Sequence, residues 1–385
     1  MIAYNRQQLD HLAIQDAAEK ALQQHCISQE EYQHIRVAYP VTLYTPNIFI
    51  RFGLFILTLV IALFSLALIL LMSEPDNPFF AGVLCMLCGL GAYVLLEAVI
   101  ISHKQHFRSG VDDALIWVSS SFVVSSICLF MRMEFSERTF CLVVFLVSLF
   151  FTLRFADRIM GLVAFLSFFA MIFYTCIYFG STGRAITPFL LIAASFIVYF
   201  LLQQVSISYY RQTVILMTIA ALVTGYIAGN YFIVRETSNT MFNLQLGITD
   251  SIPAGWLFWI FTVSIPLLYL YQGLRRKDRI LICTGLLLIT AIVFTIRYYH
   301  AVMPLDIAMM LGGLVMIVIA YAMTRYLQPS RHGFTSEAAN SDISIEMAQL
   351  ESLIITQTMG KTPGTDDTFQ FGQGSGGGAG ASGDY

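Results

Sequence analysis

Two ionisable side chains of this sequence lie inside long apolar stretches. Glu97 falls within the stretch 79–102 and Arg154 falls within 139–155. A charge in hydrocarbon is unfavourable, so such residues usually pair with one another or mark an ion or substrate pathway. If both stretches are helices, the two residues lie at a similar depth, and we expect Glu97 and Arg154 to form an intramembrane polar pair with a structural role. The alternative is that each snorkels to the membrane interface, which suits the longer Arg154 side chain better.

A second group of polar residues lies at the ends of later apolar stretches. Its members are Asn230, Arg235 and Glu236 after one stretch, and Arg297, Tyr298, Tyr299, His300 and Asp306 between the last two. From these we take as a candidate outer-face polar cluster Asn230, Arg297, Tyr298, Tyr299, His300 and Asp306. A ligand site is the less favoured interpretation, although an arginine can hold an anionic group through two parallel hydrogen bonds. Tyrosine pairs at a helix end are typical of an interfacial belt, so the alternative of a structural turn stays open.

Other residue patterns with chemical potential are better explained without a reaction. His103 and His106 have a spacing that could hold a metal on a helix face, but Lys104 between them would repel the ion. Cys85 and Cys88 form a C-x-x-C within an apolar stretch, where a reactive thiolate is disfavoured. The sequence contains no H-E-x-x-H, no G-x-S-x-G and no phosphate-binding loop motif. We therefore predict no catalytic residues, no cofactor and no metal site, and a protein that is not an enzyme.

The elements that position these residues are transmembrane helices. Hydrophobic residues make up 57% of the chain and charged residues only 12%, about half the charge of a soluble protein. A bilayer core needs about 20 apolar residues per helix. We predict an all-α polytopic transmembrane helix bundle with ten spans, at 51–72, 79–102, 114–131, 139–155, 159–180, 186–202, 213–234, 254–273, 280–297 and 305–327. The fourth and sixth spans are short, so the exact number of spans depends on them.

The distribution of Lys and Arg between the connecting loops predicts the orientation. With the N-terminus inside, the expected inner loops carry most of the basic residues, including the run Arg275, Arg276 and Lys277. Because cytoplasmic loops of membrane proteins are enriched in Lys and Arg, we expect both termini to be cytoplasmic. The first residues contain no apolar signal-peptide core, so we expect no cleaved leader.

Polar segments flank the bundle on both sides, which gives three expected domains. Residues 1–47 should form a cytoplasmic helical hairpin, with Ser28 and Glu31 in the spacing of a capping box. Residues 48–327 form the bundle. Residues 328–385 form a cytoplasmic tail with one amphipathic helix at 341–357 and a disordered Gly-rich end. Both appendages carry apolar stripes that are too small to be stable alone. We expect Leu9, Leu12 or Ile35 of the hairpin to approach Met347, Leu350 or Ile354 of the tail, unless the stripes pack on the inner loops.

Three segments carry a resemblance to known proteins. They are Cys26 to Tyr32 in the hairpin, Ile296 to His300 followed by Gly312 and Gly313, and the closing Gly/Ser tract. Together they resemble an uncharacterised family of bacterial, Bacteroidetes-like polytopic membrane proteins with an N-terminal cytoplasmic hairpin and a Gly/Ser-rich tail. The resemblance implies a location in a bacterial inner membrane, and it does not indicate any particular activity.

Two functions remain open on this sequence. We favour a non-enzymatic scaffold or sensor in the inner membrane, because the appendages offer cytoplasmic surfaces to a protein partner, whereas nothing indicates nucleic-acid binding. The alternative is a small-molecule secondary transporter, since ten spans can arise from two inverted halves. That alternative expects broken helices, for which Pro266 and the pair Gly89 and Gly91 are the candidates.

Overall fold

The computed structural model describes residues 2–23, 26–73, 77–131, 136–205, 207–242, 251–252 and 254–299, together with single helical positions between 307 and 325. In these residues the regular structure is helical, and one isolated bridge joins Tyr44 to His106. The chain divides into two compact units, Met1–Gly313 and Leu314–Tyr385. The expected hairpin and the helices α1 to α12 therefore belong to one unit, and the expected tail helix at 341–357 lies outside the described residues.

Nine helices of the described residues are long and apolar enough to cross a bilayer. They are α3 (Ile48–Ser73), α4 (Pro78–Val94) with its continuation η1 (Leu95–His103), α5 (Val111–Phe130), α6 (Glu137–Phe155), α7 (Arg158–Tyr178), α8 (Gly180–Gln203), α9 (Arg211–Gly229), α11 (Gly255–Arg276) and α12 (Arg279–Tyr299). This arrangement confirms the predicted all-α polytopic membrane fold. The tenth predicted span, 305–327, lies outside the described residues apart from single helical positions.

Some helix bounds differ from the predicted spans for local reasons. The helices α6 and α8, predicted as the shortest spans, have 19 and 24 residues because polar residues at their N-termini join the helix. The helix α9 stops at Gly229, whereas the predicted span ran to residue 234. Asn230 adopts an extended conformation there, and its side-chain Oδ1 accepts hydrogen bonds from the amides of Phe232 (3.0 Å) and Ile233 (3.3 Å). This cap begins a separate helix, α10 (Tyr231–Phe242).

The N-terminal segment folds into the expected pair of helices, α1 (Arg6–Gln23) and α2 (Gln29–Ala38). The predicted capping box is confirmed, because the Ser28 amide donates to Glu31 Oε2 at 2.7 Å and the Glu31 amide donates to Ser28 Oγ at 3.2 Å. These bonds from Ser28 lower the pKa of Glu31. The hairpin is closed by Gln8, whose side chain accepts a hydrogen bond from the Thr42 amide beyond α2.

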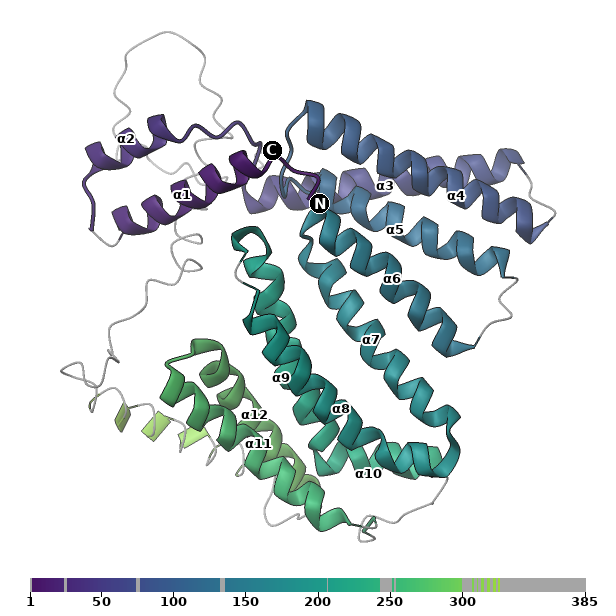
Figure 1. Cartoon of the computed structure of the whole chain (residues 1–385), viewed down its shortest axis with the longest axis vertical. Coiled ribbons are helices and arrows are strands. Elements are labelled where there is room, and N and C mark those ends of the chain that lie inside the picture. The colour runs from purple at the N-terminus through teal and green to yellow at the C-terminus, as the bar shows by residue number, and fades with distance from the viewer. Residues whose placement is uncertain are drawn as a thin grey trace, which may run out of the picture. The chain divides into compact units, whose positions relative to one another are not determined.

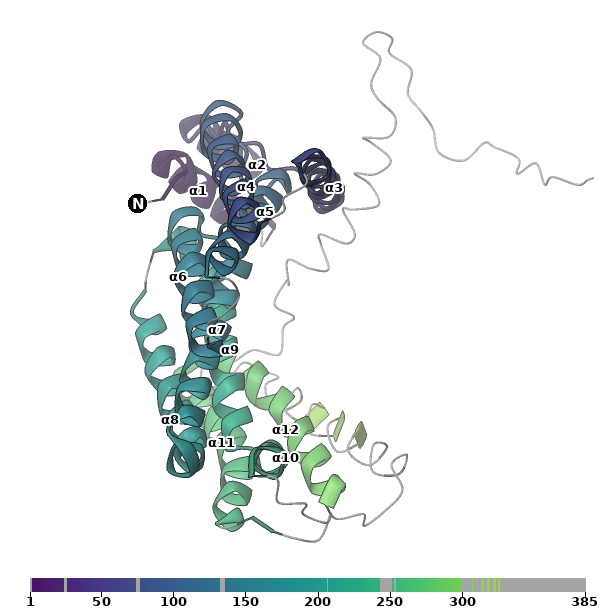
Figure 2. The ribbon, with the colours of Figure 1, turned by 90° about the vertical axis from the view of Figure 1, so that its right-hand side faces the viewer.

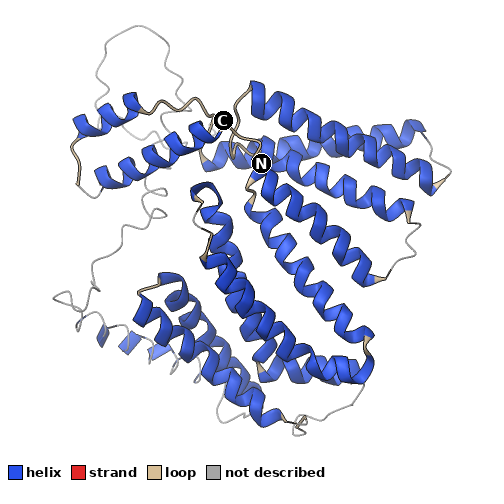
Figure 3. Ribbon diagram, viewed as in Figure 1, coloured by secondary structure: helices blue, strands red, loops and turns tan. Residues whose placement is uncertain are grey.

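The membrane helices pack as neighbouring pairs, α4 with α5, α6 with α7, α8 with α9 and α11 with α12 (Figure 1). Short connections join most of them (Figure 3). Ser119 and Ser126 of α5 donate to the carbonyls of Gly89 and Gly82, each at 2.8 Å. Small residues allow this close approach of two helix backbones in a membrane. The helix α4 continues through Gly89 and Gly91, so the expectation of a break there was wrong.

The described residues form three buried apolar clusters, of which the smallest contains Tyr231, Val234, Ile252 and Phe258. The first joins the hairpin to the membrane helices and contains Tyr4, Leu9, Leu96, Phe107, Phe151 and Phe155. The second lies among α7, α8, α9, α11 and α12 and contains Phe165, Tyr199, Leu222, Tyr226, Ile265 and Leu288. The helix α3 contacts α5 and lies to one side of α4 and α5 in Figure 2. Most of its apolar side chains are exposed. Leu9 is thus buried against the bundle, which accounts for the apolar stripe of α1.

Candidate functional site

The structure brings Glu97 of η1 and Arg154 of α6 into an ion pair, in which Arg154 Nη2 donates to Glu97 Oε1. The side chains retain 30% and 25% of their exposure, respectively, so the pair is half-buried. Among the described residues, the second carboxylate oxygen, Glu97 Oε2, is buried and has no hydrogen-bond partner. The pair therefore keeps one unused acceptor inside the apolar part of the protein.

Glu97 lies in a π-helix, which the sequence pattern did not predict. The segment η1 (Leu95–His103) has nine residues of this wider helix, and its end is marked by hydrogen bonds from the Lys104 amide to the Val99 carbonyl and from the His106 amide to the Ile100 carbonyl. π-helices are rare, are usually shorter than this one, and are frequent at functional sites. Within this segment Glu97 pairs with Arg154 of α6, and its neighbour Leu96 is fully buried.

The backbone around Arg154 is a junction between the hairpin and the bundle. Its carbonyl accepts a hydrogen bond from the amide of Ala3 at 2.8 Å. The adjacent carbonyl of Leu153 accepts one from the Tyr210 hydroxyl at 2.5 Å. Two residues further on, Ala156 adopts a left-handed conformation and ends α6. Arg154 therefore touches Glu97 with its side chain and the N-terminal segment with its backbone.

A second connection joins the hairpin to α5 through Tyr4 and Asp112. The Tyr4 hydroxyl donates to Asp112 Oδ2 at 3.2 Å, and both residues are buried. Asp112 also accepts from the amides of Arg108 (2.7 Å) and Ser109 (2.8 Å). Burial, followed by the negative charges of Asp112 and Asp113, raises the pKa of Tyr4 well above its ordinary value. The hydroxyl therefore stays protonated and remains a donor.

Charged residues of both signs surround a cavity of about 400 Å³ beside this connection, between α3, α5 and α7. Arg51 donates to Asp113 Oδ2 through Nη2 at 2.6 Å and through Nε at 2.9 Å. Asp157 caps α7 by accepting from the Met160 amide at 2.7 Å, and burial raises the pKa of Asp157. Sequence reasoning missed Arg51, Asp113 and Asp157 as a group. Each stands at the start of an apolar stretch, and that position was the only available signal.

The candidate outer-face cluster is brought together in part. Asn230 is buried and donates to the Tyr226 hydroxyl (2.8 Å) and to Thr295 Oγ1 of α12 (3.0 Å). On the same helix, the Tyr299 hydroxyl donates to Glu236 Oε1 at 3.2 Å. Arg235, which is only 3% exposed, pairs with the same oxygen at 2.6 Å.

The remaining members of that cluster have separate positions. Tyr298 packs edge-on against Phe232 with ring centroids 4.8 Å apart, and Arg297 lies in the last turn of α12. His300 and Asp306 lie outside the described residues. The described polar groups of the cluster bond to one another across the α9–α10 break and α12, which is the geometry of a structural joint.

The described part of the chain offers no metal site. Among the described residues, no three His, Cys, Asp or Glu side chains gather in a way that could hold a metal ion. His106 Nδ1 instead lies 2.8 Å from Ser109 Oγ. No family model, no curated protein and no solved structure matches the chain.

Proposed function

We propose that this chain is a non-enzymatic sensor or scaffold of a bacterial inner membrane, with both termini in the cytoplasm and with the hairpin as its interaction end. The observation that carries the proposal is the double engagement of Arg154, whose side chain pairs with Glu97 and whose carbonyl binds the amide of Ala3. One residue thus belongs both to the intramembrane pair and to the attachment of the hairpin.

The π-helix supplies the element that can change state. An insertion of this kind can relax to an α-helix, and that change would rotate Glu97 relative to α6. A change in the Glu97–Arg154 pair then shifts the end of α6, where Ala3 is bound. A sensor requires such a two-state element, in which a signal at one site shifts the equilibrium between the states and a second site changes its structure in response.

The surface that reports the change is α2. This helix has no buried residue, and Val37 is 80% exposed. In contrast, α1 buries Leu9 against the bundle. A cytoplasmic protein partner would therefore bind α2 while α1 carries the signal from the membrane.

The basic residues near the hairpin support its cytoplasmic position. The hairpin is attached at the end of the bundle that carries the basic residues of the expected inner loops. Two of these basic residues form hydrogen bonds with glutamines, Arg108 with Gln212 and Arg276 with Gln203. Basic residues are enriched on the cytoplasmic side of membrane proteins.

The proposal is tested by hydrogen–deuterium exchange of the full-length protein in lipid nanodiscs. Arg154→Leu removes the pairing charge and keeps the backbone carbonyl, and we expect faster exchange throughout α1 than in the wild type. The matched control is Glu236→Gln, which disrupts the ion pair with Arg235 far from the hairpin in sequence and should leave α1 unchanged. Unaltered exchange of α1 in Arg154→Leu would contradict the coupling.

The transporter alternative is supported by one observation, the break between α9 and α10 beside a cavity lined by Ala228 and Phe173. Broken helices line the substrate sites of many transporters. Cysteine substitution at Ala228 separates the two functions. Alternating access requires labelling from both sides of the membrane, whereas a sensor allows labelling from one side.

A further inference from the structure

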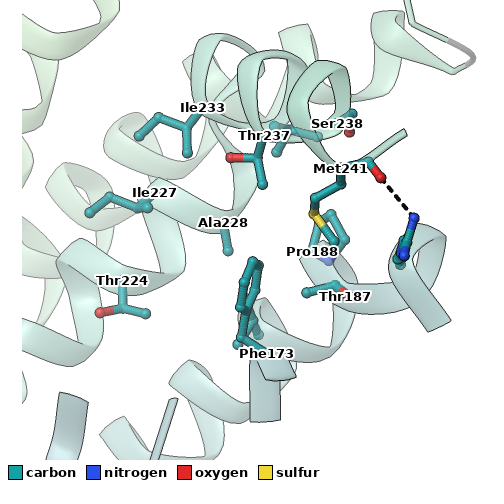
Figure 4. Close-up of a pocket in the computed structure, with 13 residues that line it drawn as sticks. Phe173, Thr187, Pro188, Thr224, Ile227, Ala228, Ile233, Thr237, Ser238 and Met241 are labelled. Atoms are coloured by element: carbon teal, nitrogen blue, oxygen red, sulfur yellow. Dashed lines mark hydrogen bonds between the residues drawn. The ribbon is translucent and has the colours of Figure 1, made fainter. Parts of the chain in front are cut away.

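A cavity of about 250 Å³ lies among α7, α8, α9 and α10 (Figure 4). Its walls are largely apolar and include Phe173, Leu191, Ile227 and Ala228. The figure shows the hydroxyl-bearing residues Thr187, Thr224 and Thr237 around the same space. The cavity is smaller than the drug-sized pockets of about 300–1,000 Å³, so its ligand must be small.

A helix break and a proline inside a continuous helix lie beside this space. The helix α9 ends at Gly229, and α10 leaves in a new direction from Asn230. On the facing helix, Pro188 lies inside α8 and has no amide hydrogen to donate to the carbonyl one turn earlier. Thr187 turns its hydroxyl to the carbonyl of Gly183 at 2.9 Å. Both features line the cavity, since Pro188 and Thr187 of α8 and Ala228 near the end of α9 are among its walls.

Among the described residues that line the cavity, Arg184 carries the one charged side chain and none carries a carboxylate. Arg184 Nη1 donates to the carbonyl of Met241 at 2.7 Å, drawn as the dashed line in Figure 4. Its guanidinium carbon lies 5.7 Å from the ring centroid of Phe242. Arg184 Nε is buried and has no acceptor among the described residues. The cation is thus held in place with a donor still unused.

We propose that this cavity binds a small amphiphilic monocarboxylate. The carboxylate would accept hydrogen bonds from the Arg184 guanidinium, whose planar fork matches its geometry. The short hydrocarbon chain would lie against Phe173, Leu191 and Ala228. The apolar walls disfavour a strongly hydrated anion such as phosphate, which would lose its hydration on binding. The charge of Arg184 favours a carboxylate over an uncharged chain of the same length. The inference is independent of the proposed sensor, because the cavity shares no residue with the Glu97–Arg154 pair, and it concerns the same cavity as the transporter alternative.

The test uses the full-length protein in nanodiscs of zwitterionic phospholipid, with hexanoate as the probe and calorimetric titration as the measurement. Hexanoate should bind at least about tenfold more tightly than hexanol, acetate or inorganic phosphate, because only hexanoate has both the charge and the chain. Arg184→Gln should weaken hexanoate binding by about tenfold, and Arg184→Lys should weaken it less, since the charge stays and the fork is lost.

Two further variants separate the site from general effects. Ala228→Leu fills the cavity without touching the charge and should abolish binding, with its melting temperature as the check on folding. Arg138→Gln is the matched control, because Arg138 lies over the ring of Tyr178 at 3.8 Å and does not line the cavity. Equal hexanoate affinity in the wild type and Arg184→Gln, or in the wild type and Ala228→Leu, would overturn the proposal. Equal binding of acetate or phosphate would overturn it as well. Either result leaves the exchange test of the hairpin unaffected.

Discussion

The backbone amide of Ala3 donates a hydrogen bond to the carbonyl of Arg154 at 2.8 Å, although the two residues lie in separate parts of the chain. Arg154 directs its side chain to Glu97 in the π-helix η1. Tyr4, the residue after Ala3, reaches α5 through Asp112. Two consecutive residues, Ala3 and Tyr4, therefore bind this N-terminal segment to α6 and α5, respectively.

The Glu97–Arg154 pair predicts an asymmetry between two substitutions. Glu97→Gln keeps an acceptor for Arg154, whereas Glu97→Lys places two positive charges in contact in a half-buried site. We expect Glu97→Lys to destabilise the protein by about 2 kcal/mol more than Glu97→Gln, a value below that of a fully buried pair because the site is partly exposed. Melting in one detergent measures the difference, with Glu137→Lys at the exposed start of α6 as control. Equal melting temperatures of the two Glu97 variants would contradict a contribution of the Glu97–Arg154 pair to stability.

The charge distribution predicts the topology of the chain. A reporter fused after Gln328 should give a cytoplasmic signal, and a reporter inserted at 74–77, after α3, should give an external one. The two fusions serve as controls for each other, because a correct orientation requires opposite signals. The reverse pattern would overturn the orientation and with it the cytoplasmic hairpin.

Gly110 predicts a strong effect of a single added methyl group. It has a φ of +91°, and a Cβ there would lie 2.0 Å from the carbonyl oxygen of Arg51 in α3. We expect Gly110→Ala to destabilise the protein by about 1–3 kcal/mol from backbone strain alone, and by more from the clash. Gly91→Ala is the control, because nothing lies within 4 Å of its Cβ position. If both variants melt at the wild-type temperature, α3 does not pack on Gly110.

The capping box predicts a pH dependence of α2. The folded pKa of Glu31 is lowered by Ser28, so its contribution to stability is present above the unfolded pKa of about 4.3 and is lost as the pH falls through the lower folded value. Ser28→Ala should weaken this dependence and remove about 1 kcal/mol of local stability. Glu31→Gln should remove the dependence, because in Ser28→Ala the amide of residue 28 still donates to the Glu31 carboxylate. Amide exchange of α2, corrected for its intrinsic pH dependence, measures both effects. Glu30→Gln should retain the dependence; if it also loses it, the capping box is not the cause.

Features that depend only on residues close together in the sequence were predictable from the sequence. The apolar runs located the helices that the structure describes as long enough to cross a membrane, because the length of a span is set by bilayer thickness and not by neighbours. The capping box of Ser28 and Glu31 was predictable because its hydrogen bonds close within four residues. Glu97 and Arg154 stood out because charge is rare in apolar runs.

Only the tertiary structure determined which helices pack together and where cavities remain between them. Arg51 and Asp113 are 62 residues apart, and no local pattern joins them. The π-helix of Glu97 and the cavity at Arg184 likewise depend on how neighbouring helices pack. The physical reason is that apolar side chains favour burial in lipid or protein but do not determine which helix they pack against. A hydrogen bond or a cavity, in contrast, forms only where two particular helix faces from distant parts of the chain meet.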